Sequence, residues 1–203
     1  MTFESNHYRS KEGFVTTERV PPHAHTWPSW MFWWNIISIV LLLWDASFVL
    51  LRPSSLPGGP LDFLFPGYSL YTEVDTSYGD MEDFFVPAQS LLNLFEVLLH
   101  TSALIMYTRE NTRPRATIIE FAASAMTCSK TVLYLTVEAC SGFARVTHNV
   151  KPETALLVWF VPAMLWVVFP FAICWILGNK LAAAISLDDH RATTRVVHDK
   201  KSN

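Results

Sequence analysis

Residues 89–100 read QSLLNLFEVLLH, an apolar segment that carries four polar side chains: Gln89, Asn93, Glu96 and His100. Their spacing is i, i+4, i+7 and i+11. On an α-helix, at about 100° per residue, all four fall within an arc of roughly 60°. The segment is therefore expected to form a helix in apolar surroundings, with one narrow polar stripe that faces other helices.

This segment belongs to one of four long apolar runs, at about residues 30–51, 84–107, 117–137 and 155–177. Each is long enough to cross about 30 Å of hydrocarbon. The chain has 203 residues, 51% hydrophobic and only 16% charged, a balance typical of membrane proteins. A soluble helical bundle would instead need amphipathic helices. The predicted fold class is all-α, an integral membrane four-helix bundle, in which Pro162 and Pro170 are expected to kink the last helix.

The distribution of Lys and Arg predicts the orientation of the four spans. The N-terminal tail carries three such residues, the loop between the second and third spans three, and the C-terminal tail five. The other two loops hold three together. By the positive-inside rule both termini are expected in the cytosol. The long acidic and aromatic loop between the first two spans is then expected on the lumenal side.

Residues 30–178 are predicted to form the membrane domain, between cytosolic tails at 1–29 and 179–203. The first 26 residues contain no apolar core of a signal peptide, so the first span is expected to serve as the insertion signal. The chain ends DKKSN, and Lys200 and Lys201 match the dilysine pattern of endoplasmic reticulum membrane proteins. The expected location is therefore the endoplasmic reticulum membrane.

Composition also limits the partners and cofactors. A net charge of −3 gives no electrostatic case for binding nucleic acid. Cys128, Cys140 and Cys174 are scattered and predict neither a disulfide framework nor a zinc site. No cofactor or metal is expected. The expected partners are membrane lipid and an apolar small-molecule substrate or sterol ligand, and a homodimer stays among the alternatives.

Ionisable side chains within the spans are expensive in lipid and are candidates for a functional site. Asp45 lies in the first run, Glu96 in the second and Lys130 in the third. Tyr134 follows Lys130 by one turn, and Trp159 and Trp166 share a face of the fourth run. Together these residues predict an interior with two carboxyl groups, one amine and aromatic walls, suited to an apolar ligand with a few polar contacts.

Structural roles are the alternatives for the same residues. Gln89 and Asn93 are equally compatible with hydrogen bonds that only hold helices together. Asp45 or Glu96 is also compatible with a structural ion pair to Lys130. His100 is expected near the cytosolic end of its helix, in a peripheral role. Two carboxyl groups and a lysine on three different helices nevertheless favour a site, because burying them gives no evident gain in packing.

Acid–base chemistry is the reaction type that these residues favour. Burial disfavours the charged form of a carboxyl group, so an acid in an aromatic pocket is expected to hold its proton at neutral pH. Such an acid can protonate an alkene, epoxide or carbonyl. A tryptophan face can stabilise the resulting cation. The HExxH, GxSxG and Walker motifs are absent from the sequence, so hydrolysis and phosphoryl transfer are not predicted.

Five short motifs follow one another along the chain: WDASFVLLRP (44–53), LYTEVDTSYGD (70–80), NLFEVLLHTSAL (93–104), TVLYLTVE (131–138) and MLWVVFP (164–170). Together they resemble the EXPERA superfamily, which includes the emopamil-binding proteins (sterol Δ8–Δ7 isomerases) and the sigma-2 receptor. The resemblance covers about residues 44–175 and is closest to fungal members.

The resemblance implies roles for individual residues. Asp45 corresponds to the family's first-helix acid, Glu96 to the isomerase glutamate of the second EXPERA helix, and Trp166 to the pocket tryptophan. Tyr134 and Glu138 match the end of the third helix. The loop motif places Tyr71, Asp75, Tyr78 and Asp80 on the family's aromatic and acidic loop positions.

This chain departs from the isomerase pattern at three positions. Leu41 stands where the isomerases have a histidine, Ala163 where they have an asparagine, and Thr131 where they have an acid. Lys130 is an addition that the pattern does not predict. The proton shuttle implied by the family is incomplete, while Asp45, Glu96 and Trp166 remain.

The predicted function is that of a membrane isomerase or cyclase that uses proton transfer on a sterol-, terpenoid- or polyketide-like substrate, in fungal secondary metabolism. Glu96 is the expected proton donor or acceptor and Asp45 its partner. The expected substrate-binding residues are Gln89, Asn93, Lys130, Tyr134, Trp159 and Trp166, with Tyr71, Asp75 and Tyr78 from the loop. The alternative is a non-catalytic sterol- or lipid-binding membrane protein like the sigma-2 receptor.

Overall fold

The computed structural model describes residues 26–146 and 150–202, with side chains described through residue 188 and at residue 190. Every regular element in these ranges is helical. The long helices are α1 (Ser29–Leu50), α3 (Phe85–Tyr107), α4 (Arg113–Cys140) and α6 (Val161–Ser202). The short ones are η2 (Asp62–Leu64), α2 (Tyr68–Val74), η3 (Thr76–Tyr78), η4 (Glu110–Thr112), α5 (Pro152–Ala155) and η5 (Leu156–Phe160).

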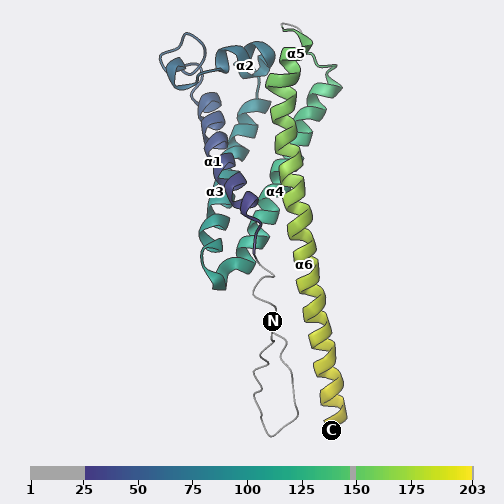
Figure 1. Cartoon of the computed structure of the whole chain (residues 1–203). Coiled ribbons are helices and arrows are strands. Elements are labelled where there is room, and N and C mark those ends of the chain that lie inside the picture. The colour runs from purple at the N-terminus through teal and green to yellow at the C-terminus, as the bar shows by residue number, and fades with distance from the viewer. Residues whose placement is uncertain (1–25, 147–149, 203) are drawn as a thin grey trace.

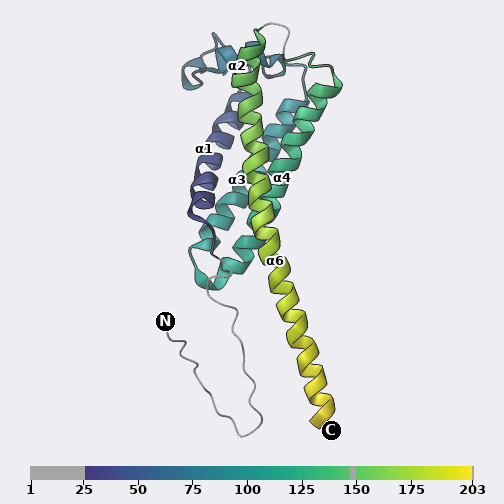
Figure 2. The same cartoon turned by 45° about the vertical axis from the view of Figure 1, so that its right-hand side comes forward.

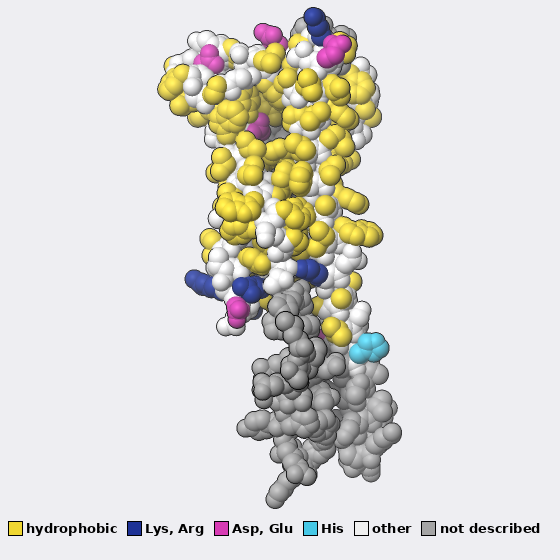
Figure 3. Space-filling model, viewed as in Figure 1, with side chains coloured by type: hydrophobic (Ala, Val, Ile, Leu, Met, Phe, Trp, Pro, Cys, Tyr) yellow, Lys and Arg dark blue, Asp and Glu magenta, His cyan; other side chains and the backbone are white. Residues whose placement is uncertain are grey.

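Four helical stretches are long and apolar enough to cross a membrane, as the sequence predicts: Ser29–Leu50, Phe85–Tyr107, Glu110–Cys140 and Pro152–Asp188. Their outer faces are apolar, with side chains such as Trp33, Leu98 and Trp175 more than 60% exposed. In Figure 3 the middle of the molecule is covered by apolar side chains, and charged ones gather toward its two ends. This surface is the reverse of a soluble bundle and is typical of a multi-pass membrane protein.

The four long helices form a bundle (Figure 1). Helix α1 packs on α3, α3 on α4, and α4 on α6. Aromatic rings bridge α1 and α6: Trp34 stacks on Phe169, with ring centroids 4.2 Å apart, and contacts Trp166. These rings fill the gap near the N-terminal part of α1. Nearer the C-terminal part of α1 the gap remains as a cavity.

We call the end of the bundle that carries residues 51–84 the cap end, and the end with the α3–α4 connection the turn end. The cap was expected as a loop, but it contains η2, α2 and η3. Pro53 stops α1, since the residue before a proline disfavours the helical conformation. Gly67 then begins α2 with φ +92°, a left-handed conformation that favours glycine.

Polar contacts hold the cap over the bundle. Arg52 donates hydrogen bonds to the carbonyl oxygens of Ser77, Tyr78 and Asp80, at 2.9–3.2 Å. Arg145, which follows α4, forms an ion pair of 2.7 Å with Asp83. Arg52 thus ties the end of the cap that follows α1 to residues 77–80, and Arg145 ties the cap to the segment after α4. These contacts hold the cap over the cavity.

The last helix differs from the sequence prediction, which ended the span near Leu177. Helix α6 has 42 residues, about 63 Å at 1.5 Å per residue, and extends beyond the bundle at the turn end (Figures 1 and 2). Residues 181–187 are rich in alanine and leucine, which are strong helix formers. Pro162 follows a π-helical turn, an adjustment with which helices accommodate proline, and the helix continues through Pro170.

The predicted N-terminal tail, apart from residues 26–29, lies outside the described residues, as do the side chains of Lys200 and Lys201.

The polar stripe faces the other helices, so that prediction is confirmed. Asn93, Glu96 and His100 are buried and Gln89 is half-buried. Polar residues of neighbouring helices meet the stripe, whereas apolar clusters close the two ends of the bundle. The middle of the bundle is therefore the polar part of its core.

Candidate functional site

A cavity of about 430 Å³ lies in the cap half of the bundle. Figure 3 shows a hollow at this level, between α1 and α6, in which an acidic side chain is visible. The lining residues are Leu41, Leu42, Trp44, Asp45, Pro66, Gly67, Tyr68, Tyr71, Tyr78, Val86, Gln89, Ser90, Asn93, Lys130, Thr131, Tyr134, Val158, Trp159, Pro162, Ala163 and Trp166. This size and a mainly apolar, aromatic lining with a few polar groups are typical of small-molecule sites.

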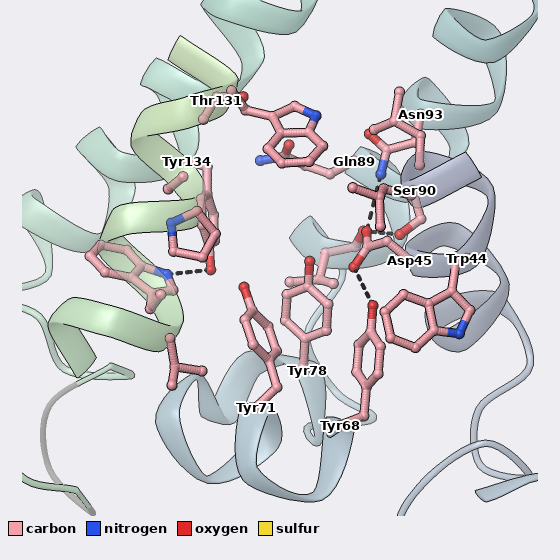
Figure 4. Close-up of a pocket in the computed structure, with 18 of the residues that line it drawn as sticks. Trp44, Asp45, Tyr68, Tyr71, Tyr78, Gln89, Ser90, Asn93, Thr131 and Tyr134 are labelled. Atoms are coloured by element: carbon pink, nitrogen blue, oxygen red, sulfur yellow. Dashed lines mark hydrogen bonds between the residues drawn. The ribbon is translucent and has the colours of Figure 1, made fainter. Parts of the chain in front are cut away.

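Asp45 is the carboxyl group that lines this cavity. The Tyr68 hydroxyl donates a hydrogen bond of 2.8 Å to Oδ1, and the Asn93 amide donates one of 3.2 Å to Oδ2. Figure 4 shows Asp45 held between these two side chains. Three elements, α1, α2 and α3, therefore fix the position of one acid at the cavity wall.

Lys130 also lines the cavity, and its ammonium group pairs with Glu96. Lys130 Nζ lies 3.0 Å from each Glu96 carboxylate oxygen and donates a further hydrogen bond to the Asn93 side-chain oxygen. Thr127 donates a hydrogen bond of 2.9 Å to Glu96 Oε2. Glu96 is fully buried and is not among the lining residues. It therefore lies behind Lys130, in contact with the lysine rather than with the cavity.

Asn93 joins the two charged groups into one cluster. Its amide nitrogen donates to Asp45 and its oxygen accepts from Lys130. The cluster of Asp45, Asn93, Glu96 and Lys130 holds two carboxyl groups and one amine. An uncompensated charge is expensive away from water, so neutrality of this cluster requires one proton on its carboxyl groups. A single transferable proton beside an apolar cavity is the chemical property that this arrangement provides.

Three tyrosines of the cap close the cavity at the cap end, and in Figure 4 the hydroxyls of Tyr68, Tyr71 and Tyr78 point into it. Burial raises the pKa of all three phenols, and the nearby carboxyl group of Asp45 raises it further. At Tyr71 the carboxyl group of Asp75 also raises the pKa. The hydroxyls therefore stay neutral and act as hydrogen-bond donors. They can orient a polar end of a ligand.

A second polar group supports the opposite wall. The Tyr134 hydroxyl donates to Asp75 and accepts a hydrogen bond of 2.6 Å from Trp159 Nε1. Asp75 is fully buried and also accepts a hydrogen bond of 3.0 Å from the Ser77 backbone. Burial raises the pKa of Asp75, although the hydrogen bonds from Ser77 and Tyr134 oppose the shift. Asp75 positions Tyr134 and Trp159 and does not line the cavity itself.

Tryptophan rings form much of the remaining wall. Trp44, Trp159 and Trp166 come from α1, η5 and α6. Trp44 is tied to the cap by a hydrogen bond of 3.2 Å from Nε1 to the Leu64 carbonyl, and Trp166 contacts Trp34. The faces of such rings attract cations, so the cavity provides surfaces that stabilise a developing positive charge.

The structure brings most of the predicted site residues together. Of those named from the sequence, Asp45, Tyr71, Tyr78, Gln89, Asn93, Lys130, Tyr134, Trp159 and Trp166 line the cavity. Glu96 and Asp75 contact residues that line it but do not line it themselves. The three positions that depart from the isomerase pattern, Leu41, Thr131 and Ala163, all line the cavity.

Two features of the polar core were not predicted from the sequence. Tyr68, the direct partner of Asp45, was not named, although its spacing of three residues from Tyr71 placed both on one face of a helical turn. His100, expected in a peripheral role, is 3% exposed and pairs with the buried Glu120 at 3.1 Å. Its position in the polar stripe was the available signal for this second pair.

No family model, no curated protein and no solved structure matches this chain. Among the described side chains, no three His, Cys, Asp or Glu residues lie close enough together to hold a metal ion. The residues that line the cavity are therefore the basis for proposing a function.

Proposed function

We propose that this protein is a membrane isomerase or cyclase that acts by proton transfer on an apolar, sterol-, terpenoid- or polyketide-like substrate. The observation that carries this proposal is the placement of Asp45, held by Tyr68 and Asn93, at the wall of an aromatic cavity of about 430 Å³. A proton donor in a largely apolar cavity meets the requirement of acid-initiated double-bond shifts and cyclisations.

In this proposal Asp45 is the catalytic residue, because it faces the substrate. Glu96 is a positioning residue that acts through Lys130 and Asn93 and balances the charge of the cluster. Trp166 and Trp159 face the developing cation, and the tyrosines of the cap bind a polar group of the substrate. The role first expected for Glu96, direct proton transfer, stays a prediction.

We also propose the superfamily membership and the cellular location that the sequence predicts. The chain would be a member of the EXPERA superfamily of the fungal type, inserted in the endoplasmic reticulum membrane with both termini in the cytosol. The cap end would then face the lumen. The four apolar helices and the apolar outer surface support the membrane part of this proposal.

The test is product formation from candidate sterols, terpenoids and polyketides in microsomes that contain the protein. Asp45→Asn is expected to lower turnover by about 10²- to 10⁴-fold, the usual contribution of a general acid. Glu96→Gln is expected to lower kcat and to shift its pH profile, because it removes a charge from the cluster. Glu120→Gln, a buried acid outside the cavity lining, is the matched control. Undiminished turnover in both Asp45→Asn and Glu96→Gln would refute the proposal.

A non-catalytic sterol- or lipid-binding role is the second candidate, and a specific observation favours it. Leu41, Thr131 and Ala163 place apolar or neutral groups in the cavity wall where the isomerase pattern has a histidine, an acid and an asparagine. Tight binding of sterols without turnover, and failure to rescue a yeast that lacks sterol isomerase, would support this role instead.

A further inference from the structure

The group that the proton-transfer proposal uses least is Lys130. An amine in the middle of a spanning helix is expensive, and a hydrogen-bonded amide would join α3 and α4 without a charge. Lys130 nevertheless lines the cavity, and its side chain is 10% exposed beside the buried Asn93 and Glu96. Such an amine is in a position to react with a ligand in the cavity.

The neighbours of Lys130 match the requirements of a lysine that forms an imine. Such a lysine must lose a proton, and Glu96 lies 3.0 Å from Nζ to accept it. The iminium ion formed afterwards carries a positive charge in low-dielectric surroundings, and a carboxylate of the cluster balances this charge. Asn93 places the Asp45 carboxyl group one amide away from Nζ. A carbon next to the iminium would therefore lie beside an acid–base group.

We propose that Lys130 forms an imine with an apolar aldehyde or ketone in this cavity, and that such carbonyl compounds are the substrate class of the protein. Glu96 takes a proton from Lys130, and the neutral amine adds to the carbonyl carbon to give a carbinolamine. Asp45 gives its proton to the carbinolamine hydroxyl, which leaves as water, so the iminium ion is paired with the Asp45 carboxylate. Where a double bond joins the β and γ carbons of the carbonyl compound, the Asp45 carboxylate removes a proton from the α carbon, next to the iminium, and returns it to the γ carbon at the far end of the resulting dienamine. Water then hydrolyses the iminium and releases the isomerised carbonyl compound and the free lysine.

This inference rests on the proposed function, because it uses the proton transfer by Asp45, but it can fail separately. Citral, a terpenoid aldehyde, and geraniol, a related alcohol, serve as the probes. The purified protein in detergent is incubated with citral and sodium cyanoborohydride, which reduces an imine to a stable amine. Peptide mapping by mass spectrometry then locates the added mass, which is that of citral less one oxygen atom. Quenching of tryptophan fluorescence by geraniol, measured separately, reports entry into the tryptophan-lined cavity.

The expected result is an adduct on Lys130 in the parent protein and none at this position in Lys130→Arg, which keeps the charge but forms no imine. Lys180→Arg is the matched control, because Lys180 is a partly buried lysine on α6 that bonds the Thr26 carbonyl outside the cavity lining. This variant is expected to label at Lys130 as the parent does.

Three results would overturn the inference: geraniol binding without an adduct on Lys130, an adduct spread equally over the other lysines, or no entry of either probe. Loss of turnover in Asp45→Asn without an adduct on Lys130 would leave the proton-transfer function in place and remove only the imine. An adduct on Lys130 with full turnover in Asp45→Asn and Glu96→Gln would leave the imine in place and remove the proton-transfer function.

Discussion

Two buried acid–base pairs lie in the interface between α3 and α4, with their α3 members Glu96 and His100 one helical turn apart, and they differ in what surrounds them. Near the cap end, Lys130 and Glu96 adjoin a cavity. Toward the turn end, His100 and Glu120 are enclosed, with Ser124 as a further partner of Glu120 at 3.0 Å. Neither His100 nor Glu120 lines the cavity.

The packing between α1 and α6 explains this difference. Toward the turn end, Trp34 stacks on Phe169 and fills the gap between the two helices. Trp27 and Tyr107 stack below them, with ring centroids 4.2 Å apart. Toward the cap end, Trp44 and Trp159 stand on either side of the gap and leave it open. A buried acid–base pair in a spanning helix thus becomes a candidate site only where the packing leaves room for a ligand.

The largest expected effect on stability comes from breaking the pair at the cavity. Lys130→Met leaves Glu96 buried without its cation and is expected to lower the free energy of unfolding by about 3–5 kcal/mol. Lys130→Met combined with Glu96→Leu is expected to recover most of this loss, since no charge then remains. Chemical unfolding in detergent micelles measures both. A loss below about 1 kcal/mol in the single variant would show that water from the cavity already solvates Glu96.

Trp34 lies in the closed part of the bundle and Trp44 beside the cavity, so their loss is expected to affect stability and binding differently. Trp34→Ala removes a stacked ring from the α1–α6 contact and is expected to cost about 3 kcal/mol. Trp44→Ala is expected to cost about 1 kcal/mol, because Trp44 is 37% exposed, but to weaken geraniol binding. Unfolding curves and fluorescence titrations of the two variants test this. Equal losses of stability would contradict the view that only one of these rings closes the bundle.

A smaller effect is expected from Asn35, which faces the core from α1. Asn35 is fully buried, and neither polar atom of its side chain has a hydrogen-bond partner in the described structure. Asn35→Leu is therefore expected to raise the free energy of unfolding by about 1–3 kcal/mol. Thermal unfolding in micelles provides the measurement, with Ser124→Ala as the control that removes a satisfied group. Destabilisation by Asn35→Leu would show that the amide binds buried water or another partner.

The smallest expected effect is a pH dependence from the cap. Burial raises the pKa of Asp75 above its ordinary value of 3.8, so the folded protein holds this proton more tightly than the unfolded chain. The stabilisation from this group is complete below pH 3.8 and is lost as the pH rises through the raised pKa. Asp75→Asn is expected to make stability less dependent on pH over this interval. Parallel pH profiles of unfolding for the two proteins would contradict this.

The helical architecture and the candidate polar residues follow from the sequence alone. Long apolar runs predict spanning helices because backbone groups in lipid must bond within their own segment. A carboxyl group or an amine in such a run must face other helices, so Asp45, Glu96 and Lys130 stood out without a structure. The arc of the polar stripe followed from helical periodicity alone.

Which of these groups lies at the cavity, where a ligand can reach it, depends on the tertiary structure. The register between helices, set by the packing of whole side chains, puts Lys130 and Asn93 between Glu96 and the cavity and brings Tyr68 of the cap onto Asp45. Periodicity gives the face of a helix on which a residue lies. It gives neither the height at which a neighbouring helix presents its partner nor the place where large rings fail to close the gap. For that reason the sequence put Glu96 at the centre of the site, and the structure puts Asp45 and Lys130 at the cavity wall.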